Sequence, residues 1–178
     1  MKIVIITGSP HKKGPSALLA EKFIKGAAEK GHSVFRFDAA FEDVYPCTAC
    51  NKCRSSMADP CVFDDDMGKL YPQLLEADLI AFVSPLYYYS VSAQLKLVID
   101  RFYPINSKIM GNKKAVLMMT AEAKGEEAMS GAIKSYLEAI KYLKWIDCGM
   151  VLAGGCGVRE EIENSNFPEK AYQLGKSL

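Results

Sequence analysis

The residues best suited to chemistry in this chain are four cysteines in the stretch PCTACNKCRSSMADPC, residues 46–61. They are Cys47, Cys50, Cys53 and Cys61, with two, two and seven residues between them. Thiolates at two-residue spacing can turn inward from one short loop, so the pattern fits a four-cysteine iron–sulfur cluster or a tetrahedral zinc ion. A disulfide pairing, or four thiols that lie close together without a ligand, are the alternatives.

Composition favours a metal or redox site over a disulfide framework. The N-terminal MKIVIITGSP has too short an apolar run for a signal peptide, and no uncharged stretch approaches the roughly 20 residues that span a bilayer. We therefore expect a cytoplasmic protein, in which structural disulfides are rare. A formal charge of +1 gives no electrostatic footprint for a nucleic-acid or membrane partner. The length of 178 residues fits a single domain over 1–178, with a cysteine-rich loop at about 44–64.

A second candidate site is the turn in TGSPHKKGPSALLAEKF, residues 7–23. A turn rich in Gly, Ser and Pro before a helix presents free backbone N–H groups and the positive end of the helix dipole, which together favour a phosphate. Ser9 and Ser16 add hydroxyl donors, and His11 and the two lysines after it add positive charge. The stretch matches neither a Walker loop nor the G-x-G-x-x-G fingerprint. An ordinary turn capped by Ser16 is the alternative.

Three consecutive tyrosines, Tyr87, Tyr88 and Tyr89, follow another apolar run in SPLYYYSVSAQLKLVIDRF, residues 84–102. Neighbouring residues cannot all point into a core, and each hydroxyl needs a partner or water. We expect them to supply an aromatic wall, with Ser90 beside it to meet the polar edge of a flat heterocycle. A tyrosine-rich dimer surface is the alternative. A third loop begins at Thr120, which like Ala121 is small enough to let a ligand approach the backbone.

The elements that would position these residues can be read from hydrophobic periodicity. Most of the strand-length apolar runs do not alternate with polar residues, which suits strands buried on both faces of a parallel sheet. The runs are residues 2–8, 33–38, 79–85, 114–120 and 147–155. Helical segments lie between them, so we predict a doubly wound α/β domain with right-handed crossovers. Ligands of such sheets bind outside the carboxyl ends of the strands, where the candidate loops fall.

The helices are predicted from apolar residues at helical spacing within 19–27, 95–102 and 129–143, with a last helix after Pro168. Pro104 should end the second of these helices. A further helix over 66–77 should kink or restart at Pro72, because proline removes one backbone hydrogen bond. Asp65 and Asp66 are interpreted as cap and first-turn residues of that helix. The remaining cysteines, Cys148 and Cys156, are predicted to be packing residues.

The combination of GSPHKKGPSALL, PCTACNKC with CVFDDDM, and SPLYYYSVSAQLKLVIDR resembles the flavodoxin-like family of NADPH-dependent FMN reductases, in the branch that includes iron–sulfur flavoproteins. The resemblance is dense over residues 1–104 and looser afterwards. It implies a five-stranded, three-layer α/β/α flavodoxin-like sheet, FMN as cofactor, and a homodimer or dimer of dimers. It also implies a [4Fe–4S] cluster on the four cysteines, although members of the family also keep such cysteines without an evident cluster.

The resemblance assigns site residues to two loops. The first would hold the FMN phosphate through Ser9, His11, Ser16 and Ala17. The second would line the isoalloxazine through Pro85, Leu86, Tyr87, Tyr88, Tyr89 and Ser90. Two positions depart from the family pattern, which commonly has Arg in place of His11 and Asn in place of Pro15. Neutral histidine binds phosphate less firmly than arginine, and proline has no N–H to donate.

Two functions follow as hypotheses. The first is an FMN-dependent oxidoreductase that accepts hydride from NAD(P)H and reduces a flavin, a quinone or a similar acceptor, with no side chain assigned as a catalytic acid or base. The second is an iron–sulfur flavoprotein that passes electrons between a ferredoxin-type partner and FMN. Because the cysteine segment follows the second strand, we expect it on the same sheet edge as the flavin. A third hypothesis, a phosphate-binding hydrolase or phosphatase on a similar sheet, is disfavoured, since a thiol phosphatase needs an arginine six positions after a loop cysteine and no cysteine here has one.

Overall fold

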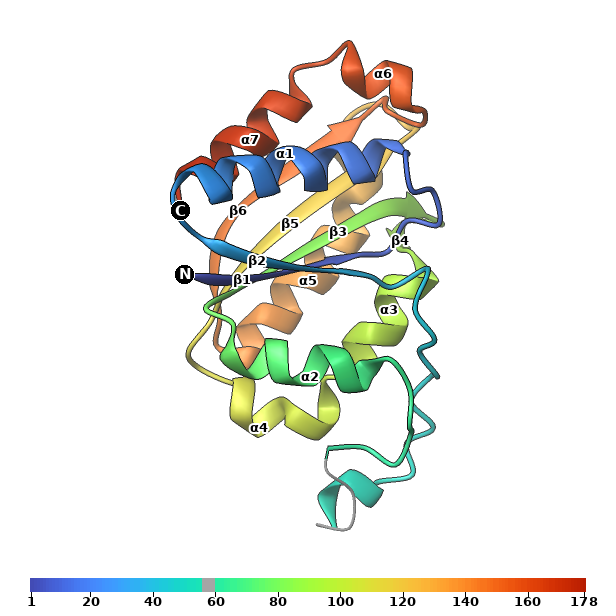
Figure 1. The fold of residues 1–178 in the computed structure, drawn as a ribbon. Coiled ribbons are helices and arrows are strands. Elements are labelled where there is room, and N and C mark those ends of the chain that lie inside the picture. Colours follow the sequence, from blue (N-terminus) through green and yellow to red (C-terminus); the bar gives the residue numbers. More distant parts are fainter. Residues whose placement is uncertain (56–59) are drawn as a thin grey trace.

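The computed structural model describes residues 1–55 and 60–178 (Figure 1). In this part of the chain one sheet contains five parallel strands in the order β2-β1-β3-β5-β6, with a short strand β4 paired antiparallel to β3. The strands are β1 (Lys2–Thr7), β2 (Ser33–Asp38), β3 (Leu79–Tyr87), β4 (Ser90–Val91), β5 (Lys114–Ala121) and β6 (Ile146–Gly154). The five predicted strands are confirmed, and their order is the doubly wound, flavodoxin-like one.

Helices cover both faces of this sheet, which gives three layers (Figure 1). One face carries α1 (Pro15–Glu29), α6 (Arg159–Glu163) and α7 (Phe167–Lys176). The other carries α2 (Met67–Glu76), α3 (Ala93–Asp100), α4 (Asn106–Ile109) and α5 (Ser130–Leu143). Short 3₁₀ turns, η1 (Lys52–Arg54), η2 (Tyr103–Ile105) and η3 (Glu127–Met129), complete the described structure.

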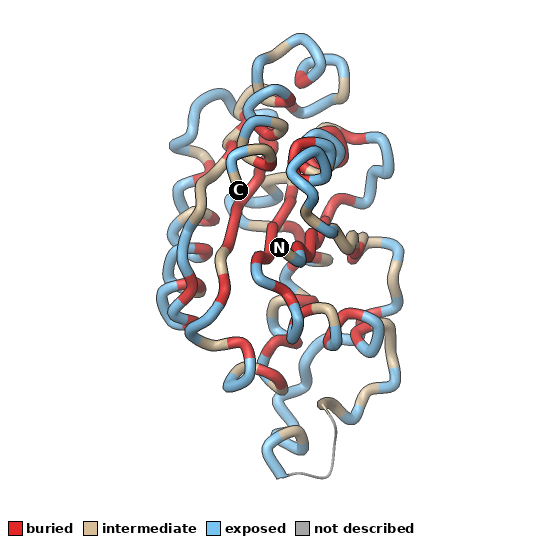
Figure 2. Tube along the Cα trace, turned by 60° about the vertical axis from the view of Figure 1, so that its left-hand side comes forward, coloured by how far each residue is buried: buried red, intermediate tan, exposed pale blue. Residues whose placement is uncertain are grey.

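The core is divided by the sheet into two clusters of buried side chains. Along β1, Val4 and Ile6 pack toward the face of α2, α3 and α5, whereas Ile3 and Ile5 pack toward α1 and α7. Alternate residues of a strand point to opposite faces, so a continuous apolar run serves both clusters. Figure 2 shows the result, with the buried stretches concentrated on the strands and the sheet-facing sides of the helices.

Helix α3 ends at Asp100, before Pro104 as predicted, whereas other local features differ from the prediction or were not predicted. Helix α2 runs through Pro72 without restarting, because Leu70, Tyr71 and Leu74 hold its apolar face in the core. Pro104 lies inside η2, and α4 follows it. Neither α6 nor β4 was predicted, since elements of five and two residues are too short to show a hydrophobic period.

The helices that were predicted from longer patterns are confirmed. Helix α1 ends just before Gly31, whose φ of +76° is a left-handed conformation that glycine adopts readily. Helix α7 begins at Phe167, with Pro168 in its first turn. Within the described residues, no helix is both long and apolar enough to cross a bilayer.

Candidate functional site

The turn between β1 and α1 is fixed by a close approach to the start of α3. The Gly8 N–H donates to the Val83 carbonyl at 2.8 Å, and the Gly8 carbonyl accepts from the Ser92 hydroxyl at 2.7 Å. A Cβ atom on Gly8 would lie 2.3 Å from Ser92 Oγ and 2.6 Å from Leu95 Cβ. Only glycine fits here, and the turn is thereby joined to the segment that follows β3.

The start of α1 leaves backbone donors available. Gly14 is the N-cap residue, and no side chain of the described residues caps this helix end. Ser16 is therefore not the cap, which removes the reading of this turn as one closed by its own serine. The turn itself is held by the His11 N–H, which donates to Ser9 Oγ at 3.2 Å, and by the Gly14 N–H, which donates to the His11 carbonyl at 3.0 Å.

A hollow of about 310 Å³ opens beside this turn. It brings three of the residues assigned to the FMN phosphate together, namely Ser9, His11 and Ala17. Lys12 joins them, with its ammonium 4.6 Å from the centroid of the Phe41 ring. The side chains of Lys12 and His11 and the buried hydroxyl of Ser9 thus face one space, which suits the binding of a phosphate.

The far wall of this hollow comes from residues that sequence reasoning missed. They are Thr7, Arg36, Asp38 and Phe41. Asp38 accepts from Thr7 Oγ1 at 2.5 Å and from Arg36 Nε at 2.8 Å, so the acidic group is already paired with a cation. Thr7 and Asp38 lie opposite each other in the β1–β2 register. The pairing of β1 with β2 places these residues beside the turn, and the sequence alone did not give that pairing.

Ser16 contributes to the site differently from the prediction that it faces a phosphate. Its hydroxyl is buried and lies 2.8 Å from the hydroxyl of Thr120, at the end of β5. Ala121 is buried next to it. This hydrogen bond ties the start of α1 to the third predicted loop, so Ser16 and Thr120 form the floor between the two loops rather than part of the hollow.

The three tyrosines form a tight hairpin between β3 and β4. Tyr88 and Tyr89 are its two central residues, with φ angles of 46° and 61°. Positive φ at both central positions is the geometry that matches the twist of paired strands, yet it is normally supplied by Asn and Gly. Tyr88 is fully exposed at 101% and Tyr89 is 71% exposed. The prediction that the tyrosines do not belong to the core is confirmed for the hairpin.

The residues around this hairpin are anchored to the other loops. Pro85 and Leu86 are half-buried, and Ser90 is exposed. The Ser92 N–H donates to Ser84 Oγ at 2.8 Å, while its hydroxyl donates to the Gly8 carbonyl. The loops after β1, β3 and β5 are thus linked at one edge of the sheet by Gly8, Ser92, Ser16 and Thr120. We call this region the flavin edge.

The described parts of the cysteine segment, residues 46–55 and 60–64, lie at the other end of α3. Cys47, Cys50, Cys53 and Cys61 line one small hollow together with Phe63, Arg101, Tyr103 and Pro104. Arg54 from η1 donates to the Tyr103 hydroxyl at 2.9 Å. The segment leaves β2 at the carboxyl edge of the sheet but then runs along the α3 side to its C-terminal end (Figure 1). The expectation that these cysteines share an edge with the flavin loops is therefore wrong within one chain.

The backbone of this segment turns sharply between its first three cysteines. One residue in the left-handed conformation lies between each two of the first three cysteines, namely Ala49 with a φ of 53° and Asn51 with a φ of 57°. The backbone N–H of Lys52 lowers the pKa of the Cys50 thiol, and Thr48 adds a weaker hydrogen bond. N–H groups aimed at sulfur are what a thiolate ligand needs. Cys148 and Cys156 are apart from this group and pack against the core, where burial raises the pKa of each thiol.

The four thiols do not match a site for one metal ion. All six cysteines are free, and among the described residues no three His, Cys, Asp or Glu side chains converge closely enough to hold a single ion. The cysteines of a cubane cluster stand at separate corners, so a wider spacing around a common hollow is compatible with that group. Four thiols around one hollow are the donor set that an iron–sulfur cluster uses.

The prediction that Asp65 and Asp66 serve the start of α2 is confirmed, since Asp66 is the N-cap residue and Asp65 Oδ1 accepts from the Met67 N–H at 3.1 Å. The Asp66 carboxylate also accepts from the Asp43 N–H at 2.7 Å. Asp65 forms a buried ion pair with Arg101 at 2.6 Å. Arg101 was missed as a site residue, because 36 positions separate the two and only the packing of α3 brings them together.

The strand order and the helices on both faces of the sheet define a protein of the flavodoxin-like fold class. The model of the NADPH-dependent FMN reductase family matches residues 1–148, and the chain belongs to that family.

Several relatives carry a related name. An iron–sulfur flavoprotein of Archaeoglobus fulgidus is 29% identical over 180 residues, which cover 100% of this chain and 79% of that protein. Another, from Methanocaldococcus jannaschii, is 35% identical over 105 residues, 59% of this chain. That match spans about half (53%) of the relative's length.

Solved structures with the same fold include an NAD(P)H:quinone oxidoreductase from Methanothermobacter marburgensis, with a TM-score of 0.76 and 19% identity over 98% of this chain and 94% of that one. An azoreductase from Bacillus anthracis has a TM-score of 0.73 and 16% identity, with both chains fully covered. At these identities the likeness establishes the fold alone.

Proposed function

We propose that this protein is an FMN-dependent oxidoreductase that accepts hydride from NAD(P)H and reduces a small-molecule acceptor such as a flavin or a quinone. The observation that carries the proposal is the flavin edge, where three loops are joined by buried hydrogen bonds and an open hollow with cationic side chains lies beside the first of them. Membership of the FMN reductase family supports it.

The residues of the flavin edge fit FMN in their chemistry. Ser9, His11, Lys12 and the uncapped start of α1 would hold the phosphate beside the hollow. Lys12 offsets the departure at His11, because it supplies the permanent charge that a neutral histidine lacks. Pro85 to Ser90 would line the isoalloxazine, with Thr120 and Ala121 closing the site from β5. Bound FMN would supply hydride acceptance and electron transfer, so the chain itself needs to position the ring and control access.

The test is anaerobic reduction of the FMN-loaded protein. NADPH and NADH are each mixed with it, and the visible absorbance of the flavin is followed. We expect bleaching by at least one nicotinamide nucleotide, with reoxidation when a quinone is added. Free FMN at the same concentration without protein is the control for reduction in solution. Bound FMN that neither nucleotide reduces would contradict the reductase proposal.

A second function rests on the cysteine segment. Four free thiols that line one hollow favour a [4Fe–4S] cluster, which when bound would supply single-electron transfer from a ferredoxin-type partner. The thiols lie at the C-terminal end of α3 and the flavin edge at its N-terminal end, so electrons would cross the length of this helix or pass to a second chain. Eight helical residues span about 12 Å.

The cluster is tested by anaerobic reconstitution with iron and sulfide, followed by metal counting. We expect about four irons per chain in the wild type, the number set by the cluster type. Cys50→Ala should take up far less, whereas Cys148→Ala, which alters a thiol outside the segment, should match the wild type. One zinc and no iron, or no metal, would remove this second function.

We further propose that two chains pair through the tyrosine hairpin, as a homodimer or as part of a dimer of dimers. Tyr87, Tyr88 and Tyr89 are 42%, 101% and 71% exposed, and aromatic side chains are enriched at interfaces. Light scattering at micromolar concentration should give at least twice the chain mass. A cytoplasmic location is consistent with six free cysteines.

A further inference from the structure

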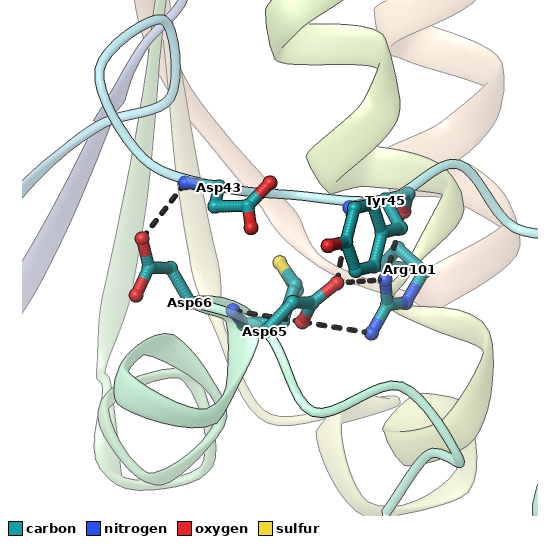
Figure 3. A network of polar contacts seen from close by, with 6 residues as sticks. Asp43, Tyr45, Asp65, Asp66 and Arg101 are labelled. Carbon is teal, nitrogen blue, oxygen red and sulfur yellow. Dashed lines mark hydrogen bonds and ion pairs between the residues drawn. The ribbon is translucent and has the colours of Figure 1, made fainter.

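Both ends of the cysteine segment meet at one buried ion pair. Arg101 Nη1 lies 2.6 Å from Asp65 Oδ2, and Nη2 donates to Oδ1 at 3.1 Å, so the pairing is bidentate. The two side chains are 1% and 0% exposed. Figure 3 shows this network, in which Arg101, at the end of α3, contacts Tyr45 on one side and Asp65 on the other.

The ion pair holds the chain before the first cysteine and the chain after the last one. Arg101 Nη1 also donates to the Tyr45 carbonyl at 2.8 Å, and the Tyr45 N–H donates to Asp65 Oδ2 at 3.0 Å. Tyr45 lies two residues before Cys47, and Asp65 four residues after Cys61. Asp43 and Asp66 add a second link, since the Asp43 N–H donates to the Asp66 carboxylate at 2.7 Å and the Asp66 N–H donates to the Asp43 carbonyl at 2.9 Å. We call these contacts the Arg101 clamp.

The same guanidinium borders the thiols. Arg101 lines the cysteine hollow and lies 5.0 Å from the centroid of the Phe63 ring, which also lines it. Burial alone would lower the pKa of Arg101, but the hydrogen bonds to Asp65 outweigh it and hold the pKa above its ordinary value. The group is therefore a permanent cation. Its Nε and the Tyr71 hydroxyl are buried without a hydrogen-bond partner among the described residues.

We propose that Arg101 is the positioning residue of the cysteine site, which closes the loop that carries the four thiols and sets the charge beside whatever they bind. The part that concerns a bound cluster rests on the second function proposed above. A buried cation favours the more negative, reduced state of a cluster, so it should raise the reduction potential. A surface ion pair of the same helix, between Lys96 and Asp100, has neither role and is a matched control.

The first experiment needs no cluster. Trypsin cleaves after Lys52 and Arg54, both inside the segment. In metal-free protein the double variant Arg101→Gln/Asp65→Asn should be cleaved there about tenfold faster than the wild type, because cleavage follows the population of opened loop. The control Lys96→Gln/Asp100→Asn should be cleaved at the wild-type rate. Unchanged cleavage in the double variant would overturn the clamp.

The second experiment uses the reconstituted protein and reads the potential as well as the iron content. The double variant should hold less iron than the wild type, and the cluster that remains should have a lower reduction potential. Arg101→Lys keeps the charge but not the bidentate geometry, so it should lose iron while its potential stays near that of the wild type. Equal iron and equal potential in all variants would overturn the role of Arg101 toward a cluster.

The outcomes separate the two proposals. A wild type that takes up no iron removes the cluster, while the trypsin result still decides the clamp. If the double variant neither binds FMN nor unfolds cooperatively, Arg101→Lys is used for both measurements. Trypsin should then cleave Arg101→Lys faster than the wild type, and cleavage at the wild-type rate would overturn the proposal.

Discussion

The two ends of α3 carry two regions that are built in different ways. At its N-terminal end Ser92 joins the helix to Gly8 and Ser84, within a mesh of hydrogen bonds that uses three strand ends. At its C-terminal end Arg101 joins the helix to the cysteine segment through buried hydrogen bonds to Tyr45 and Asp65. The flavin edge is thus supported by the sheet, whereas the thiols lie on a loop whose two ends are held by a buried ion pair.

This difference teaches where each region is vulnerable. The flavin edge is sensitive to added side-chain volume, because the backbone of Gly8 approaches Ser92 too closely for a side chain. The cysteine segment is sensitive to the loss of one charge, because both side chains of its ion pair are buried. A buried pair that loses one partner leaves an uncompensated charge, which costs far more than loss of a surface pair.

The largest effect should therefore come from neutralising the acid of the clamp. Asp65→Asn should lower the free energy of unfolding by about 3–5 kcal/mol, because Arg101 stays buried and charged. Asp38→Asn at the flavin edge is the matched control. Its ion pair with Arg36 is 29% and 34% exposed, and breaking it should cost less than about 1 kcal/mol. Urea unfolding of both variants checks this, and equal losses would refute the contrast between the two regions.

A change of volume should instead damage the flavin edge. Gly8→Ala should lower the free energy of unfolding by about 1–3 kcal/mol through overpacking against Ser92 and Leu95, and FMN affinity should fall with it. Gly68→Ala in α2 is the control, since none of the described atoms lies within 4 Å of the added Cβ. Unfolding curves and FMN titration measure the two effects. A Gly8→Ala protein as stable as the Gly68→Ala protein would contradict the packing argument.

The hairpin offers a smaller effect of the opposite sign. Tyr89→Gly should raise the free energy of unfolding by about 1 kcal/mol, since glycine adopts its left-handed φ of 61° without the side-chain penalty. Tyr89→Ala removes the same ring but keeps most of that penalty, so the difference between the two variants isolates the backbone. Both should bind FMN more weakly if the ring lines the flavin. Thermal unfolding and flavin fluorescence provide the readouts, and no difference between Gly and Ala would count against strain in the hairpin.

The smallest effect concerns thiol reactivity. The lowered pKa of Cys50 leaves more thiolate at neutral pH, whereas burial raises the pKa of Cys148 and leaves less. Iodoacetamide should modify Cys50 first, and its rate should reach a plateau at lower pH than that of Cys148. Thr48→Val removes one hydrogen bond to the thiol and should slow Cys50 a few-fold. Peptide mapping over a pH series checks the order, and faster modification of Cys148 would contradict it.

Much of the flavin edge could be predicted from the sequence because its residues follow strands that are visible as apolar runs. The turn at Ser9 to Ala17 and the exposed tyrosines follow such strands directly. The wall formed by Arg36, Asp38 and Phe41 could not be predicted, since it depends on β2 lying beside β1. Ser16 was placed in the correct region, but its hydrogen bond to Thr120 depends on the packing of α1 over β5.

The cysteine segment shows the opposite balance. Its four candidate ligand cysteines were evident from their spacing, but their position was not, because a segment without periodicity gives no direction after it leaves the sheet. The pairing of Asp65 with Arg101 joins a loop to a helix end 36 residues away. Neither residue carries a local signal of its partner, and Asp65 beside Asp66 resembles an ordinary helix start.

The central claim, that the flavin edge binds FMN through its phosphate, is tested most directly by titrating apo-protein with FMN and with riboflavin under identical conditions. We expect one FMN per chain and at least about tenfold weaker riboflavin binding, because one charge-assisted contact to phosphate contributes on the order of 1.5–3 kcal/mol. Ser16→Asp, which sets a carboxylate beneath the turn, should remove most of the preference for FMN, whereas Ser16→Ala should retain it. Riboflavin that binds as tightly as FMN to the wild type would contradict the assignment of this turn.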